Sequence, residues 1–423
     1  MFTPIIRRFS TSKQSVVIIG SGWGGFKVLQ NLDPTKYDIT VVSPRNHFVF
    51  TPLLASTAVG TLEFRCIAEP VRHKKRSAKY FEAYARKIDI EKKVLHCENA
   101  LKKGDFSLKY DKLIIACGAI SNTFGTPGVY ENAFFLKEVA DARNIRHRVI
   151  DNFELAAEPD TPEEDKKALL HFAVVGGGPT GIELSAELHD FIEHDVSKLY
   201  PHLKPYTKIT VFDVAEKILG SFDARLGAYA TKKFKRDGIQ LRTGTKIQEV
   251  KENKLILADQ SEVPVGMVVW ATGLTENPFI KSLPFVKDKS KRLMTDQFLR
   301  VRLESFETVK DIYALGDCAN IENYNLPQTA QVANQKANYL AKEMNKAADL
   351  PKPFTYYHKG AMAYVGDWRA LVDTPTKIKG GGITAWLFWR SSYFTMTVSW
   401  KNKVLIPAYW FLTWLSGRDI SRF

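Results

Sequence analysis

Two glycine-rich segments, 156 residues apart, constrain the fold of this chain more than any other feature of its sequence. Each segment follows a short apolar run that is typical of a buried parallel strand, and each precedes a predicted helix. The pattern in both is G-x-G-x-x-G, formed by Gly20, Gly22 and Gly25 and again by Gly176, Gly178 and Gly181. Such glycines allow a tight turn, close approach of the backbone to a pyrophosphate, and close packing of helix on strand. The recurrence predicts an α/β fold with two doubly wound, Rossmann-like dinucleotide-binding domains.

The rest of the chain fits this α/β pattern. Apolar runs predict further strands at 37–43, 112–119, 208–213 and 311–319, short strands and turns over 238–273, and helices at 138–155 and 327–347. Residues 158–168 are acidic, contain two prolines and lack apolar periodicity, so we expect an exposed connection there.

The residue that ends the second strand of each domain indicates which nucleotide binds. An acidic residue at this position accepts hydrogen bonds from a ribose 2′-hydroxyl and repels a 2′-phosphate. Asp213 stands there in the second domain, which favours NADH over NADPH. Its distance from Gly176, 37 residues, exceeds the usual ~20 because a long excursion intervenes. Ser43 stands there in the first domain, where its hydroxyl is a weaker ribose partner.

Two dinucleotide loops in one chain suggest FAD in the first domain and NADH in the second. Asp317 follows the apolar run IYALG, where its carboxylate either bonds the ribityl chain of a flavin or caps a helix. Glu183 lies two residues after Gly181. Its carboxylate either interacts with the helix dipole or lies where nicotinamide meets flavin, orienting the ring or relaying a proton.

The helix predicted at 327–347 carries two glutamines on one face. Gln331 and Gln335 are four residues apart, and small residues between and beyond them leave room for a flat molecule. Those small residues are Ala330, Ala333 and Ala337. By itself this pattern is more typical of an ordinary surface helix.

Residues 383–416 contain five of the eight tryptophans. Arg390, Lys401 and Lys403 break the apolar runs, and Pro407 interrupts the second run, so the segment is too polar to span a bilayer. Tryptophan favours the membrane–water interface and the basic residues suit anionic headgroups, so we expect membrane attachment. The alternative is a buried core or a dimer interface.

Composition adds three expectations. The net charge of +14 indicates an anionic partner, and a lipid surface is preferred because no nucleic-acid-binding signature is present. Residues 1–13 include Arg7 and Arg8, and no acidic residue precedes Asp33, so this segment resembles a mitochondrial presequence. The four cysteines form neither C-x-x-C nor C-x-x-x-x-C, which argues against a zinc cluster and a dithiol pair and for a bound redox cofactor.

Together these motifs resemble the type II (alternative, rotenone-insensitive) NADH:quinone oxidoreductases of fungal and plant mitochondria, along nearly the whole chain. The similar stretches are 46–72, the second glycine loop, ALGDCA, AQVANQ, 359–373 and 417–423. The resemblance implies that Thr51 lies near the flavin and that Glu183 lies near the contact between nicotinamide and flavin. It also implies a quinone site at Ala330, Gln331, Asn334 and Gln335. Many members have histidine at position 334, so Asn334 receives no proton role.

The resemblance implies a single-subunit oxidoreductase that uses FAD, oxidises NADH, reduces ubiquinone and pumps no protons. It implies a homodimer on the mitochondrial inner membrane, attached peripherally, with no nucleic-acid partner and no metal. The corresponding domains are a presequence (1–13), a discontinuous FAD domain (14–150 and 285–348), an NADH domain (151–284) and a membrane-attachment domain (349–423).

Two other functions remain open at this point. A sulfide:quinone or disulfide-type flavoprotein needs a cysteine pair at the flavin, for which Cys117 and Cys318 are the candidates, because both follow strand ends. A flavoprotein of the apoptosis-inducing-factor type, which acts through partners or nucleic acid, would explain the positive charge.

Overall fold

The computed structural model describes residues 13–346, 352–375, 379–397 and 399–421, and the chain divides into two compact units. The first unit comprises Met1–Phe48, Pro70–Ile120 and Thr275–Tyr357, and the second comprises Val49–Glu69, Ser121–Leu274 and His358–Phe423. The proposed presequence, apart from Lys13, lies outside the described residues. Residue 150, where we predicted the end of one domain, lies within helix α5 (Val139–Ala157) of the second unit.

The first unit is built on a sheet with a parallel centre. The five central strands, in spatial order, are β20 (Thr308–Ala314), β8 (Lys112–Ile115), β1 (Gln14–Ile19), β2 (Tyr37–Ser43) and β5 (Lys79–Asp89), all paired in parallel. Antiparallel pairing extends the sheet from β5 to β6 (Val94–Asn99) and β7 (Asp105–Lys109). Beyond β20 lie β19 (Arg300–Arg302), β18 (Leu293–Thr295) and β21 (Ala319–Ile321). Strands β1 and β8, at the centre, are nearly continuous apolar runs, as expected for strands that are covered on both faces.

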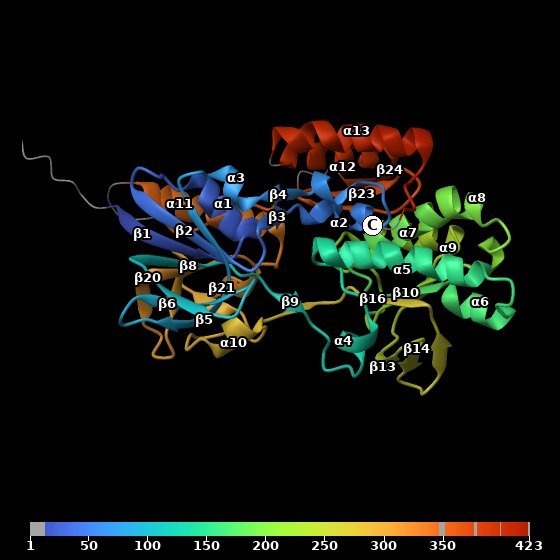
Figure 1. Cartoon of the computed structure of the whole chain (residues 1–423), viewed down its shortest axis with the longest axis horizontal. Coiled ribbons are helices and arrows are strands. Elements are labelled where there is room, and N and C mark those ends of the chain that lie inside the picture. Colours follow the sequence, from blue (N-terminus) through green and yellow to red (C-terminus); the bar gives the residue numbers. More distant parts are fainter. Residues whose placement is uncertain (1–12, 347–351, 376–378, 398, 422–423) are drawn as a thin grey trace, which may run out of the picture. The chain divides into compact units, whose positions relative to one another are not determined.

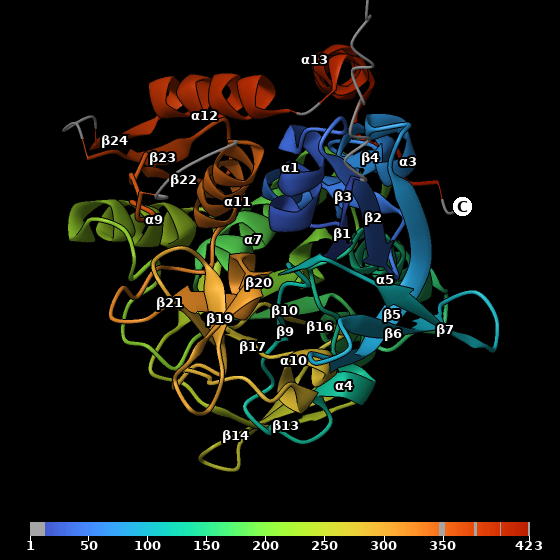
Figure 2. The same ribbon diagram turned by 90° about the vertical axis from the view of Figure 1, so that its left-hand side faces the viewer.

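Two helices distant in sequence lie side by side in this unit. They are α1 (Trp23–Asn31), which follows the first glycine loop, and α11 (Ala330–Asn345), which carries the two glutamines (Figure 2). The side chains of Asn31 and Asn338 join them by a hydrogen bond of 2.6 Å. The shorter elements are α3 (Val71–Lys74), α10 (Pro278–Ser282) and the 3-10 turn η5 (Gly316–Cys318).

The second unit contains a four-stranded parallel sheet in the order β12 (Gln240–Arg242), β11 (Lys208–Phe212), β10 (His171–Val175) and β16 (Met267–Trp270). The second glycine loop connects β10 to α7 (Pro179–Phe191) (Figure 1). Further elements are α2 (Leu54–Thr57), α4 (Val129–Asn132), α6 (Glu163–Leu169), α8 (Ser197–Leu199), α9 (Ala224–Arg236), and the antiparallel strands β13 (Ile247–Lys251), β14 (Lys254–Leu257) and β15 (Glu262–Pro264). A π-helical turn, η3 (Ile192–Val196), continues α7, and 3-10 turns lie at η1 (Thr51–Leu53), η2 (Phe64–Cys66) and η4 (Lys204–Tyr206). Short strands at the unit boundaries are β3 (His47–Val49), β4 (Ala68–Pro70), β9 (Ile120–Ser121) and β17 (Leu274–Thr275).

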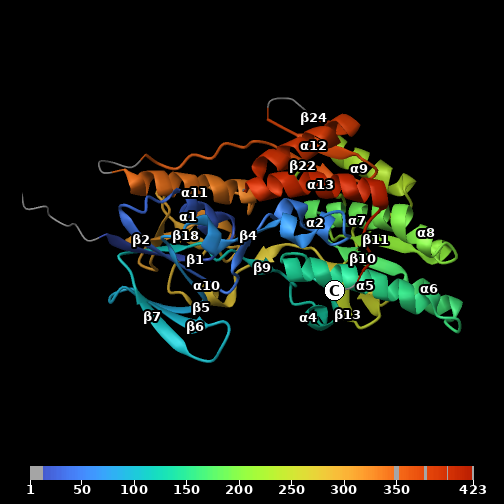
Figure 3. The same cartoon turned by 45° about the horizontal axis from the view of Figure 1, so that its top comes forward.

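The C-terminal part of the second unit is a small sheet followed by two helices. Strands β22 (Ala361–Tyr364), β23 (Ala370–Asp373) and β24 (Lys379–Gly382) pair in antiparallel fashion. They lead into α12 (Ile383–Met396) and α13 (Trp400–Ser416) (Figure 3). Among the residues that the structure describes, no helix has both the length and the apolar character that crossing a membrane requires.

One local prediction was wrong. Most of the predicted connection at 158–168 belongs to helix α6, which buries no side chain. Proline at position 162 precedes this helix, and three acidic residues in its first turn favour the helix dipole, so local signals suffice without an apolar face. Pro407, which interrupts the second apolar run of the tryptophan-rich segment, lies inside α13.

Candidate active site

The second glycine loop has the geometry of a pyrophosphate site. Gly176 adopts φ +120°, and a Cβ on Gly181 would lie 1.9 Å from the carbonyl oxygen of Gly176, so both positions require glycine. A Cβ on Gly178 would meet nothing within 4 Å, so this glycine faces open space. Helix α7 begins there without a side-chain cap and without an acidic residue in its first turn. The positive end of its dipole is therefore available to phosphate groups.

Asp213 connects this loop to the end of β11. Its Oδ2 accepts a hydrogen bond of 2.5 Å from the backbone N–H of Gly177, and its Oδ1 accepts one of 2.7 Å from Ala215. The structure thus places the predicted ribose-binding acid beside the predicted pyrophosphate loop, from which it is distant in sequence.

The first glycine loop repeats this geometry in the other unit. A Cβ on Gly25 would lie 2.0 Å from the carbonyl oxygen of Gly20, and Gly22 precedes α1 with no side-chain cap. The nearest atom to a Cβ on Gly22 would be a guanidinium nitrogen of Arg45, 3.8 Å away, which would favour an anion. These residues fit the pyrophosphate of FAD.

Two other residues proposed to bind FAD lie in the same unit as the first glycine loop. The hydroxyl of Ser43 is buried at the end of β2, 2.9 Å from the hydroxyl of Ser21. Asp317 lies in η5, directly after β20, and its carbonyl oxygen accepts a hydrogen bond of 2.8 Å from Gln328. Asp317 does not cap α11, because Thr329 does so by accepting from the N–H of Val332. The third residue, Thr51, begins η1 in the second unit.

Glu183 is a buried carboxyl group in α7. Its Oε1 accepts a hydrogen bond of 3.0 Å from the backbone N–H of Tyr364 on β22. Burial raises the pKa of Glu183 to about 8, and the carboxylate of Glu187 adds to this effect, while the Tyr364 bond opposes it. A carboxyl with that pKa holds its proton at neutral pH and is able to donate it.

Two more acidic residues continue this face of α7. Glu187 and Asp190 follow Glu183 by four and seven residues, which places all three on one side of the helix. Ser56 and Thr61 donate hydrogen bonds of 2.6 and 2.8 Å to the carboxylate of Glu187. The pKa of Glu187 is raised by burial, although the nearby guanidinium of Arg418 opposes the shift.

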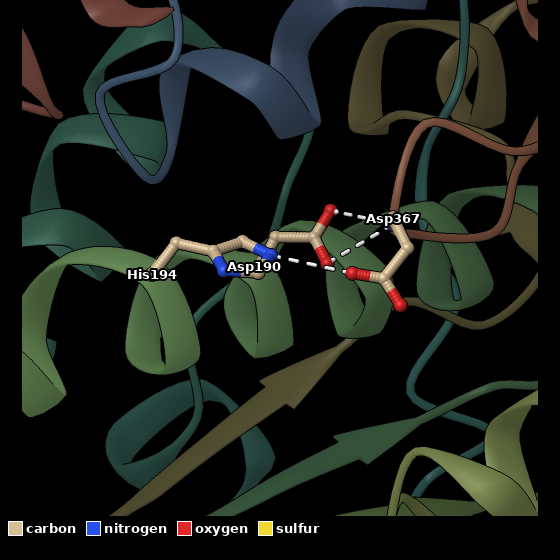
Figure 4. A group of neighbouring side chains, drawn as sticks. All are labelled: Asp190, His194 and Asp367. Carbon is tan, nitrogen blue, oxygen red and sulfur yellow. Dashed lines mark hydrogen bonds and ion pairs between the residues drawn. The ribbon is translucent and has the colours of Figure 1, made fainter.

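Asp190 also belongs to a cluster with His194 and Asp367 (Figure 4). Nε2 of His194 lies 3.2 Å from Oδ1 of Asp367, whose backbone N–H lies 3.2 Å from Asp190. The hydroxyl of Tyr364 donates a 2.5 Å bond to Asp190, and the ammonium of Lys233 lies 3.0 Å from Asp367. These partners already compensate both carboxylates, so we assign no metal to the cluster.

Gln331 and Gln335 lie on one face of α11, as predicted, and contact the same short segment. Oε1 of Gln331 accepts a 2.9 Å hydrogen bond from the hydroxyl of Tyr356. The amide of Gln335 exchanges two bonds with the backbone of Tyr357, one of 2.8 Å to its carbonyl and one of 2.9 Å from its N–H. Ala330 and Asn334 are half-buried in the same helix.

The tryptophan-rich helices leave many apolar side chains exposed. Those on α12 are Ile383, Leu387, Phe388 and Met396, and those on α13 are Trp400, Val404, Phe411, Leu412, Trp414 and Leu415. We had expected Arg390 to serve as a surface cation, but it does not. Its guanidinium stacks between Trp386 and Trp410 at 4.3 and 4.1 Å from the ring centroids, and burial lowers its pKa to about 10.

Sequence reasoning missed Tyr364 and Arg418. Tyr364 bonds both Glu183 and Asp190, while Arg418 lies 2.7 Å from Asp195 and 3.6 Å from Glu187. Both side chains border a cavity of about 600 Å³ in the second unit, together with Glu187, Asp190 and five tryptophans. The acidic residues on one face of α7 were the signal in the sequence that could have indicated Arg418, because buried carboxylates require a cation from another segment.

Comparisons with known proteins agree with these features. A family model described as pyridine nucleotide-disulphide oxidoreductase matches residues 14–337, and one described as NDH2 C-terminal domain matches residues 358–419. The chain is 43% identical over 444 residues to the internal alternative NAD(P)H-ubiquinone oxidoreductase A1, mitochondrial, of Arabidopsis thaliana, covering 97% of this chain and 86% of that protein. It is also 43% identical over 431 residues to a probable NADH dehydrogenase of Dictyostelium discoideum, covering 99% of this chain and 94% of that protein.

A solved structure shows the same likeness. The NDH2 of Plasmodium falciparum, in complex with NADH, superposes with a TM-score of 0.92 at 28% identity, covering 97% of this chain and 100% of that chain. The similarity includes the C-terminal part as well as the two dinucleotide-binding halves, because the superposition leaves almost no part of either chain uncovered.

Proposed function

We propose a route by which electrons and protons reach quinone in this chain. The premise is that the chain belongs to the family of alternative NAD(P)H-ubiquinone oxidoreductases, the type II NADH dehydrogenases. As a member it is a single-subunit, FAD-dependent NADH:quinone oxidoreductase, which confirms the resemblance seen in its sequence. FAD, when bound, accepts a hydride from NADH and passes two electrons to quinone. The roles of individual residues are our proposal.

The two glycine loops divide the two dinucleotides between them. Gly20, Gly22 and Gly25 hold the pyrophosphate of FAD, with Ser43, Thr51 and Asp317 as further contacts. Gly176, Gly178 and Gly181 hold that of NADH, and Asp213 accepts from its ribose. The strongest support is that each unit has one uncapped helix N-terminus behind such a loop.

Glu183 supplies a proton when quinone is reduced. Reduction of a quinone to a quinol consumes two electrons and two protons, and a hydride from NADH carries only one proton. A buried carboxyl group that is protonated at neutral pH suits the second transfer. The N–H of Tyr364 fixes the orientation of this carboxyl.

Gln331 and Gln335 position the quinone ring. Their amides lie on one face of α11, and both are held by the segment around Tyr356 and Tyr357. Glutamine N–H groups are suitable donors to a quinone carbonyl. Ala330 and Asn334 complete this face.

The chain associates peripherally with a membrane through α12 and α13. Ten exposed apolar side chains on these helices, four of them aromatic, support this proposal. Relatives named as mitochondrial favour the mitochondrial inner membrane as the site of action. No residue of the chain is assigned to proton pumping, and a homodimer is proposed from the family resemblance alone.

The quinone site is tested by replacing Gln331 with alanine. We expect the KM for a short-chain ubiquinone to rise at least fivefold, since loss of a hydrogen bond of this kind costs roughly 1 kcal/mol. Steady-state NADH:quinone kinetics of the FAD-loaded protein measure this change, and stopped-flow bleaching of the flavin by NADH should stay as in the wild type. Gln248→Ala, on β13, is the matched control. Unchanged quinone kinetics in Gln331→Ala would refute the assignment.

A further inference from the structure

Two cysteines that are 201 residues apart meet in the first unit. Strands β8 and β20 are parallel neighbours, with Ile115 paired to Ala314, so the segments that follow them leave the same edge of the sheet. Cys117 lies in the first of these segments and Cys318 lies in η5, at the start of the second. Both pack in one apolar cluster.

The contacts of the two thiols show how close this approach is. Sγ of Cys318 lies 3.6 Å from the carbonyl oxygen of Ile115 and 3.3 Å from that of Leu315. The side chains of Cys318 and Cys117 are close enough for each to shift the pKa of the other. The side chain of Asn277 also donates to the backbone carbonyl of Cys117, at 3.4 Å.

These contacts make the two thiols unequal. The neighbouring side chain of Cys318, with a further contribution from Asn277, lowers the pKa of Cys117. The same neighbour, together with burial, raises the pKa of Cys318 well above its usual value. A pair of neighbouring thiols with unequal pKa values is the arrangement that thiol–disulfide chemistry uses.

A buried lysine lies beside the pair. Lys336 on α11 is 1% exposed, and its ammonium donates a 3.3 Å hydrogen bond to the carbonyl of Ala319, the residue after Cys318. Burial lowers the pKa of Lys336 to about 8, and the sulfur of Cys318 partly opposes this shift. The lysine is therefore able to give or take a proton when the sulfurs react.

The other two cysteines provide the contrast. Cys66 and Cys97 are buried, and burial raises their pKa values to about 11 and about 12. Cys117, by comparison, is only half-buried. Its Cα would lie 3.0 Å from a Cβ on Gly20, which places the pair directly beside the first glycine loop.

We propose that Cys117 and Cys318 form a redox-active dithiol that a hydroperoxide converts to an intramolecular disulfide. The Cys117 thiolate attacks one peroxide oxygen and the O–O bond breaks, giving a sulfenic acid and, after protonation, an alcohol or water. The Cys318 thiol then attacks this sulfur, forms the S–S bond and releases water. Two electrons pass from the sulfurs to the peroxide, and a small dithiol reverses the reaction.

This pairing is invisible in the cysteine spacing, from which we had argued against a dithiol. It does not require that the chain act on sulfide. The disulfide would connect the end of β8 to η5, the segment that contains Asp317.

The experiment uses the FAD-loaded full chain, treated with hydrogen peroxide and then blocked with N-ethylmaleimide under denaturing conditions. Mass spectrometry should show a loss of about 2 Da and one crosslinked peptide pair containing Cys117 and Cys318, and dithiothreitol should reverse both. Cys117→Ser and Cys318→Ser should lack the crosslink, whereas Cys66→Ser and Cys97→Ser should retain it.

In the reduced wild-type protein, iodoacetamide at neutral pH should label Cys117 at least tenfold faster than Cys97. The measurements on the wild-type protein do not depend on whether any of the variants folds. A wild-type protein that stays reduced, one that accumulates sulfinic acid at Cys117 without a crosslink, or one that links either sulfur to Cys66 or Cys97 would overturn the proposal.

Discussion

Glu183 shows how burial changes the chemistry of one side chain. An exposed glutamate at this point of α7 would be ionised at neutral pH and would serve only the helix dipole. Here the carboxyl is enclosed, bonded to the N–H of Tyr364, and close to Glu187, and its pKa is raised to about 8. The choice between a dipole role and a proton role therefore depends on the surroundings that β22 and α12 provide.

Replacing Glu183 with glutamine should remove the proton donor and keep the shape of the side chain. Since a carboxyl with a pKa of about 8 is protonated below that pH, wild-type quinone reduction should fall as the pH rises through about 8. In the variant this decline at alkaline pH should vanish, and kcat should be about 100-fold lower than in wild type at pH 7. Steady-state kinetics from pH 6 to 9 measure both changes.

The same variant has a consequence for stability. A folded-state pKa above the unfolded value stabilises the fold below the unfolded pKa, and this contribution is lost as pH rises through the folded pKa. The Tm of Glu183→Gln relative to wild type should therefore increase between pH 5 and 8. A variant whose quinone reduction still falls as pH rises through about 8, or a value of Tm for the variant minus Tm for wild type that falls between pH 5 and 8, would contradict the assignment.

Asp213 should set the preference for NADH. Asp213→Asn keeps an acceptor for the N–H of Gly177 but removes the charge that repels a 2′-phosphate. We expect the ratio of kcat/KM for NADPH to that for NADH to rise about tenfold, which corresponds to ~1.4 kcal/mol. Asp259→Asn, on an exposed turn of the same unit, should leave the ratio unchanged. An unchanged ratio in Asp213→Asn would show that selectivity arises elsewhere.

At the scale of elements, α7 connects three functions. Its first turn is the proposed phosphate site, its buried face carries Glu183, Glu187 and Asp190, and it contacts β22 through Tyr364. One helix therefore links the nucleotide loop to the C-terminal part of the chain. A shift at its N-terminus would displace the carboxyl groups along with it.

Two glycines of this loop should respond differently to alanine. Gly181→Ala forces a Cβ against the carbonyl of Gly176, so it should lower the free energy of unfolding by roughly 1–3 kcal/mol. Gly178→Ala has free space and should leave stability unchanged, while raising the KM for NADH by blocking the pyrophosphate. Thermal unfolding and NADH kinetics distinguish the two effects. An unchanged KM for NADH in Gly178→Ala would mean that the loop does not approach the pyrophosphate.

At the scale of the whole molecule, the proposed membrane attachment combines the net charge of +14 with the exposed apolar side chains of α12 and α13. Apolar side chains enter the interfacial region of a bilayer, while basic residues attract anionic headgroups over longer distances. The first interaction resists salt and the second does not. Membrane attachment should therefore show both components.

Vesicle flotation should separate these two components. The full chain should bind phosphatidylcholine vesicles that contain anionic phospholipid, with affinity that falls as salt increases and then levels off. The double variant Trp400→Asp/Trp414→Asp should bind at least tenfold more weakly at every salt concentration, because each exposed indole contributes roughly 1.5–3 kcal/mol when buried. Phe124→Asp/Tyr130→Asp removes two other exposed aromatic rings, which lie outside α12 and α13, and should bind normally. Equal binding by both variants would exclude α12 and α13 as the contact.

The sequence by itself determined the repeating α/β architecture, because a dinucleotide loop requires glycine at fixed spacing between a buried strand and a helix. It also put Asp213 at the end of the second strand of its domain and the two glutamines on one helical face, since apolar runs and helical period are local properties of the chain. The helix at 163–169 was missed because its signals are charges and a proline rather than apolar periodicity.

Only the tertiary structure decided which distant groups share an environment. The raised pKa of Glu183, the partners Tyr364 and Arg418, and the stacking of Arg390 between two indoles all depend on segments more than a hundred residues apart or on separate helices. The meeting of Cys117 with Cys318 depends on the pairing of β8 with β20. Burial and proximity are properties of the packed chain, so no spacing in the sequence expresses them.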